Sequence, residues 1–80
     1  MINISACEYT EFAAYMSKQY GPQQFKKGFE LIKANRNMMY SDNGEQKLAE
    51  LLEPLGFPDK DSVRGFINFC TTYLIVQTMQ

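Results

Sequence analysis

The fold class depends on residues 63–76, which read VRGFINFCTTYLIV. The run is rich in β-branched and aromatic residues, which would suit a strand. It is, however, much longer than a typical strand of about 5–6 residues. Its apolar positions also recur at helical spacing, at Val63, Phe66, Ile67, Cys70 and Leu74. We therefore favour a buried helix over about Ser62 to Gln77, with a strand as the alternative.

This last helix has a second apolar face, formed by Phe69, Tyr73 and Val76. A helix that is apolar on two faces must be covered on both. We expect the face that carries Phe66 to pack into the monomer. The face that carries Tyr73 is expected to meet another helix or a second chain.

Two helices are predicted in the first half of the chain. Ser5 and Glu8 fit a capping box, and apolar residues then recur at helical spacing, which predicts a helix over about 5–20. The pair Gly21-Pro22 ends that helix and begins the next, over about 22–38. Gly28 lies on the apolar face of the second helix, where we expect another backbone to approach closely.

A short third helix follows a polar loop. Asp42 and Glu45 repeat the capping pattern at its start. Its last turn is weakened by Pro54, and Gly56 is expected to stop it in a left-handed conformation, with Phe57 as a hydrophobic clasp. Its apolar stripe is Leu48, Leu51, Leu52 and Leu55. The cap of the final helix is expected at Asp59, Asp61 or Ser62.

The composition indicates one small globular domain over residues 1–80. The chain is 45% hydrophobic and 21% charged, and a core of this size is only marginally stable alone, which favours association. There is no apolar run of about 18 residues and no signal-peptide pattern at Met1, so we expect an intracellular protein without a membrane segment. Cys7 and Cys70 are expected to stay unpaired, and Cys70 to lie in the core.

Charge is distributed unevenly along the chain. Residues 18–36 carry about +4 and residues 42–61 about −4 by residue count, although the formal net charge is −1. Nucleic-acid-binding domains usually have a pI above about 9, whereas this chain has a pI of about 5.3. We therefore expect a bipolar surface and no nucleic-acid partner.

The sequence does not favour an enzyme. Histidine is absent, which removes the commonest general base and metal ligand. The acids near Asp42 and Asp59 do not fit the calcium-loop pattern, and the glycines do not fit a phosphate loop. We expect no catalytic residue, no metal and no cofactor.

One stretch carries a likeness to known families. Over about residues 12–75 the elements follow one order: a helix, the run Tyr20-Gly21-Pro22-Gln23-Gln24-Phe25, a helix ending near Lys33, a short leucine-rich helix and the run Phe66-Ile67-Asn68-Phe69. This order resembles that of the harmonin-homology domains. Tyr20-Gly21, Phe25 and Ile32-Lys33 are also similar to the helical tails of some NIMA-related kinases. The first likeness implies that a partner helix is held in a hydrophobic groove. The second implies a place in cilia or centrosomes.

These observations predict an all-α bundle of four to five helices that acts as a non-catalytic interaction module of the scaffold or adaptor type. We expect it to bind an amphipathic helix or an acidic peptide, with Lys33 and Arg36 steering the acidic partner. The alternative is a homodimerisation domain that uses the C-terminal helix. The predicted groove residues are Phe25, Phe29, Ile32, Lys33, Arg36, Met38, Met39 and Tyr40.

Overall fold

The computed structural model describes residues 4 and 6–78 of the chain. Over these residues the chain is all-α, as predicted, and contains no strand. The α-helices are α1 (Tyr9–Tyr20), α2 (Pro22–Ala34), α3 (Gly44–Leu52) and α4 (Lys60–Thr78). Two short 3-10 helices, η1 (Arg36–Tyr40) and η2 (Glu53–Leu55), follow α2 and α3. The helical alternative for residues 63–76 is therefore confirmed.

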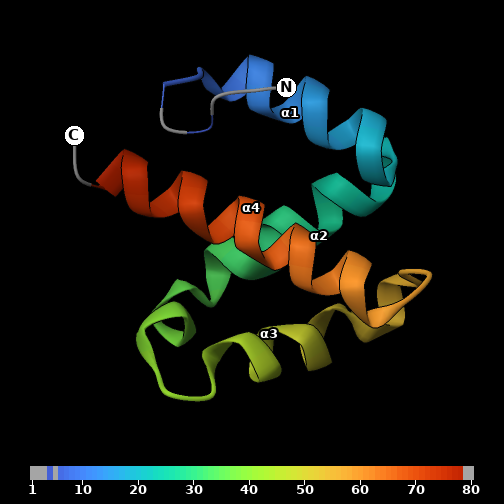
Figure 1. Ribbon diagram of the computed structural model, residues 1–80, viewed down its shortest axis with the longest axis vertical. Coiled ribbons are helices and arrows are strands. Elements are labelled where there is room, and N and C mark those ends of the chain that lie inside the picture. Colours follow the sequence, from blue (N-terminus) through green and yellow to red (C-terminus); the bar gives the residue numbers. More distant parts are fainter. Residues whose placement is uncertain (1–3, 5, 79–80) are drawn as a thin grey trace.

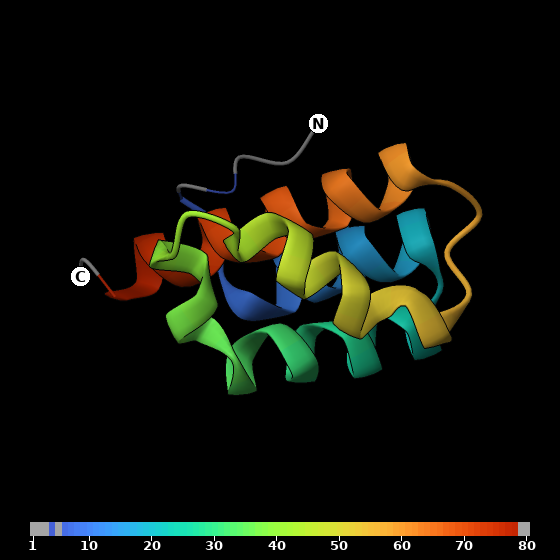
Figure 2. The same ribbon diagram turned by 90° about the horizontal axis from the view of Figure 1, so that it is seen from below.

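The helices are arranged around the pair formed by α2 and α4. Figure 1 shows α4 crossing the molecule with α1 on one side and α3 on the other, while α2 lies behind it. In the turned view of Figure 2, α3 lies in front, between α4 and α2. α1 and α2 form an antiparallel hairpin with a close contact, and α3 packs against both α2 and α4. Every helix thus buries one face against the same central core.

Five aromatic rings form a cluster in that core, at Phe12, Phe25, Phe29, Phe66 and Tyr73. Phe12 and Phe66 have no exposed surface, and Phe12 contacts the rings of Phe25, Phe29 and Tyr73 at centroid distances of 4.2–5.9 Å. Such tilted and stacked ring pairs add to the stabilisation that burial of apolar area supplies. The remaining buried apolar side chains are Cys7, Met16, Ile32, Leu48, Leu52, Ile67, Cys70 and Leu74.

The expected close approach at Gly28 exists, but its partner is a ring and not another backbone. A Cβ atom at Gly28 would lie 2.7 Å from Cε1 and Cζ of Phe66. The ring of Phe66 in turn contacts the rings of Tyr20 and Phe57, at centroid distances of 5.2 and 5.0 Å. The missing side chain at Gly28 therefore makes room for the phenylalanine of α4 between α2 and the η2–α4 connection.

The first two helices are shorter than predicted. α1 begins at Tyr9, with Glu8 as its N-cap and no side-chain capping bond, and Ser5 lies outside the described residues. α2 ends at Ala34 and not near residue 38. The reason is local: Asn35 leaves the helical conformation and its side-chain amide donates to the carbonyl of Leu31 at 2.8 Å, after which the chain continues as η1.

The third helix begins one residue later than predicted. Its N-cap is Asn43 and not Asp42, and no side chain caps it by a hydrogen bond. The predicted glycine stop is confirmed, because Gly56 follows η2 in the left-handed conformation with φ 79° and ψ 38°. The side-chain amide of Gln24 donates to the carbonyls of Leu55 and Gly56, which ties this turn to α2.

α4 begins and packs largely as expected. Of the three predicted caps, Asp59 is the one used, since its Oδ1 accepts a hydrogen bond of 2.8 Å from the backbone N–H of Ser62. The second apolar face of α4 is covered by another helix of the same chain: Phe69 packs edge-on against Tyr15 of α1, and Tyr73 is buried against Phe12.

Candidate functional site

The structure separates the predicted groove residues into two groups. Phe25, Phe29 and Ile32 are 4%, 5% and 0% exposed, so they belong to the core. They pack inside the molecule because the apolar face of α2 is turned toward α1 and α4. In this conformation the chain's own helices cover them, and partner binding at these residues stays a prediction.

The other predicted residues lie at the C-terminal end of α2 and on η1. Lys33 and Arg36 are exposed, while Met38 and Met39 are half-buried and pack against the core. Tyr40 stands out because its side chain is 67% exposed. This end of the molecule is therefore a basic surface with one prominent aromatic ring.

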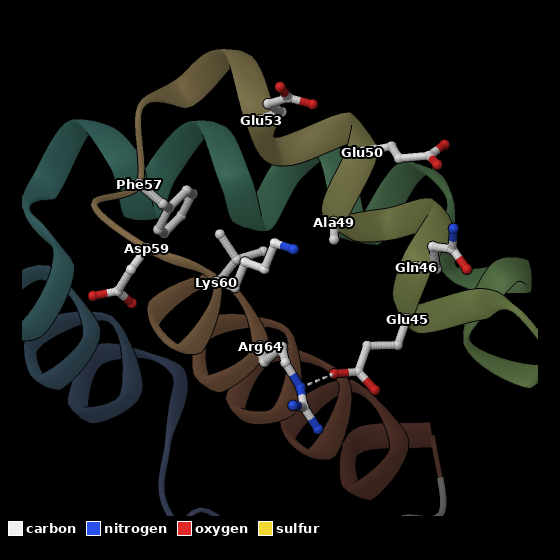
Figure 3. Close-up of a pocket in the computed structure, with 10 residues that line it drawn as sticks. Glu45, Gln46, Ala49, Glu50, Glu53, Phe57, Asp59, Lys60 and Arg64 are labelled. Carbon is white, nitrogen blue, oxygen red and sulfur yellow. Dashed lines mark hydrogen bonds and ion pairs between the residues drawn. The ribbon is translucent and has the colours of Figure 1, made fainter.

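A cleft of about 730 Å³ lies elsewhere, between α3 and the first turns of α4. Figure 3 shows it between the two helices, with Phe57 at one end and the Arg64–Glu45 pair at the other. Its apolar floor is formed by Ala49, Phe57 and Val63. Its other lining residues are Glu45, Gln46, Glu50, Glu53, Asp59, Lys60 and Arg64.

Helical periodicity explains why these residues meet. Leu48 and Leu52 of α3 are buried against the core, so the neighbouring side of the helix presents Ala49 between charged residues. On α4 the positions 60, 63 and 64 fall on one side, which turns Val63 toward the cleft between two cations. The small side chain of Ala49 leaves the space that a larger residue would fill.

Charge is unequal on the two walls of the cleft. The wall formed by α3 and the start of η2 carries Glu45, Glu50 and Glu53, and the α4 wall carries Lys60 and Arg64. Arg64 reaches across, with its Nε 3.0 Å from Oε1 of Glu45, and both side chains remain largely solvent-exposed at 69% and 55%. An exposed pair of this kind contributes little stability. Within the described part of the chain, Glu50 and Glu53 take part in no ion pair.

The sequence did not predict this cleft. The pattern predicts helix caps at Asp42 and Asp59, and of these two only Asp59 caps a helix by a side-chain hydrogen bond. One feature of the sequence does point to the cleft. Ala49 is a small residue among charged residues, on the exposed side of a helix whose other side carries a stripe of leucines.

The described residues offer little reactive chemistry. No group of three or more metal-ligating side chains is found among residues 4 and 6–78. Both cysteines are free, as predicted, and both are buried, which was predicted for Cys70 alone. Burial raises the pKa of the Cys70 thiol far above its ordinary value of 9.0. The thiol therefore stays protonated and is a poor nucleophile.

None of the helices in this part of the chain is both long and apolar enough to cross a bilayer.

No known protein family, curated protein or solved structure matches the chain.

Proposed function

We propose that this chain is a non-catalytic protein–protein interaction module that holds a helix or an extended segment of a partner in the α3/α4 cleft. The observation that supports the proposal is an apolar floor, formed by Ala49, Phe57 and Val63, that lies open between two helices. Clefts that bind ligands commonly have volumes of about 300–1,000 Å³, a range that includes this one. Binding of an amphipathic helix between two helices is also the use implied by the likeness to the harmonin-homology domains.

The walls suit reversible association. Charged side chains surround the floor, so an incoming apolar group would be enclosed by a polar rim, as in many protein interfaces. The rim charges would set orientation and association rate more than affinity. This arrangement supports the proposal of a scaffold or adaptor role.

Blocking the floor tests the proposal. Ala49→Arg places a long side chain in the cleft, and Ala14→Arg makes the same change on the exposed face of α1. We expect affinity capture from a cell extract to recover the same partner with the unchanged chain and with Ala14→Arg, and to lose it with Ala49→Arg. Equal recovery by both variants would place the binding site elsewhere. Circular dichroism and thermal melting show whether each variant is folded.

A homodimerisation domain is the second candidate, and the exposed ring of Tyr40 favours it. The C-terminal helix, which we expected to supply the dimer contact, has Phe69 and Tyr73 already packed against α1. Sedimentation over a concentration series would distinguish the two functions, because a self-associating chain leaves few monomers at high concentration. Replacing Tyr40 by Ser should then restore the monomer.

We also propose an intracellular location, with cilia or centrosomes favoured only if the likeness to the kinase tails holds. Imaging of the tagged full chain tests it.

A further inference from the structure

We infer that the occupant of the α3/α4 cleft is an amphipathic segment of another protein that carries Lys or Arg along the edge facing α3. The inference rests on the proposed function, because it names the partner chemistry for the same cleft. It reverses the partner charge expected from the sequence, which placed an acidic partner beside Lys33 and Arg36.

The charges that line the cleft carry this inference. Acidic side chains outnumber basic ones, with Glu45, Glu50, Glu53 and Asp59 against Lys60 and Arg64. All of these residues are exposed, but Glu45 is paired with Arg64 and Asp59 caps α4, which leaves Glu50 and Glu53 against Lys60 for a partner. An apolar segment with cations at its edge would meet a complementary potential along α3.

The Arg64–Glu45 pair shows how the α3 wall receives a cation. A guanidinium that comes from the opposite side of the cleft contacts a glutamate of α3 at 3.0 Å. Glu50 lies on the same helix as Glu45, and Glu53 begins η2 directly after that helix; in Figure 3 both project outward without a dashed contact. Residues three apart on a helix are neighbours, so these two carboxylates can receive cations spaced by one helical turn of the partner.

Lys60 determines the orientation in which the partner segment binds. In Figure 3 its side chain extends from α4 over the cleft, opposite the glutamates of α3. A basic edge turned toward Lys60 would be repelled, whereas a basic edge turned toward Glu50 and Glu53 would be attracted. The partner is therefore expected to carry its cations on one side only.

A second copy of this chain is a weaker occupant. Its exposed basic residues on α2 are Lys26, Lys27 and Lys33, which lie within one turn of Glu30 and have no large exposed apolar side chain among them for the floor. Tyr40 beside Arg36 on η1 does combine a ring with a cation, so self-association is one outcome that the test must separate.

The experiment selects binders from a random peptide display library with the full chain. We expect the selected peptides to combine bulky apolar residues with Lys or Arg. The double change Glu50→Lys and Glu53→Lys should weaken their binding by about tenfold or more, and Lys60→Glu should strengthen it. Glu50→Lys alone should also weaken binding, and Glu30→Lys on α2 is its matched control, since it makes the same single charge change outside the cleft and should alter affinity by less than about twofold.

The other outcomes separate the two proposals. Peptides that lack cations but lose binding with Ala49→Arg would overturn the basic-partner inference and leave the docking cleft intact. Acidic peptides that require Lys33 and Arg36 would overturn both. Failure to select any peptide, or selection of peptides indifferent to Ala49→Arg, would also count against both. Concentration-dependent assembly of the unchanged chain that both Tyr40→Ser and Ala49→Arg abolish would assign the cleft to a second copy and overturn the basic-partner inference.

Discussion

Phe12 of α1 stacks face to face on Tyr73 of α4, with ring centroids 4.2 Å apart and ring planes only 5° from parallel. Phe12 has no exposed surface and Tyr73 is 5% exposed. The pair joins the first and last helices of the chain, which are remote in sequence. It covers the face of α4 that would otherwise be open to a second chain.

We therefore expect Tyr73→Ala to lower the free energy of unfolding of the domain, and not only to weaken an interface. Removing a buried ring costs about 3–5 kcal/mol, a large share of the stability of so small a domain. Tyr73→Phe keeps the stacked ring and should cost less than about 1 kcal/mol. Chemical denaturation of both variants measures the difference. If Tyr73→Ala kept its stability and lost only self-association, the ring would be an interface residue.

Gly28→Ala should lower stability even though alanine is the better helix former by about 1 kcal/mol. The new Cβ would lie 2.7 Å from the ring of Phe66, which is fully buried and held by the rings of Tyr20 and Phe57. Overpacking of this kind costs about 1–3 kcal/mol, so we expect a net loss of up to about 2 kcal/mol in the free energy of unfolding.

A double-mutant cycle tests whether the ring of Phe66 causes this loss of stability in Gly28→Ala. In a Phe66→Leu background the ring is gone, so Gly28→Ala should there be neutral or stabilising. An equal cost of Gly28→Ala in both backgrounds would show that the two residues do not interact.

The helix pattern and most of the core could be predicted from the sequence, because they depend on periodicity and on glycine and proline positions. The apolar positions of α4 from Phe66 to Leu74 repeat every three or four residues, and the left-handed stop at Gly56 needs only local chemistry. The end of α2 was less predictable, since Asn35 ends the helix by a bond to its own preceding turn, where the apolar pattern alone favours continuation to Met38.

The cleft was beyond sequence reasoning for a different reason. It depends on the spacing of α3 and α4 after both have packed on α2, and no residue pattern within one helix encodes that distance. Likewise, Phe25 was assigned to a groove because an apolar helix face alone does not reveal whether a partner or the same chain covers it.

Gly56→Val should destabilise the fold by about 1–2 kcal/mol, the cost of placing a side chain in the left-handed conformation. Space is not the cause, because the nearest atom to a new Cβ is Nε2 of Gln24 at 3.9 Å. Gly56→Asn should cost less, since asparagine tolerates this conformation better. Thermal melting compares the two variants, and an equal loss for both would exclude a conformational origin.

Stability should fall at alkaline pH through the buried thiol of Cys70. Burial raises its folded-state pKa above the ordinary value of 9.0, so the unfolded chain loses this proton at a lower pH than the folded chain does. The unfolded state then binds fewer protons, and the free energy of unfolding decreases as the pH rises above about 9. Burial also raises the pKa values of Cys7, Tyr20 and Tyr73, which adds to the same trend.

Cys70→Ala should reduce this alkaline loss, although it also removes buried volume and lowers stability at neutral pH. Ile67→Val is the matched control, because it removes one buried methyl group from the same helix, at about 0.5–1.5 kcal/mol, and keeps the thiol. Denaturant unfolding between about pH 7 and pH 11 should show a shallower decline for Cys70→Ala, and an unchanged decline for Ile67→Val. If Cys70→Ala declined as steeply as the unchanged chain, the tyrosines or Cys7 would account for the alkaline loss and not this thiol.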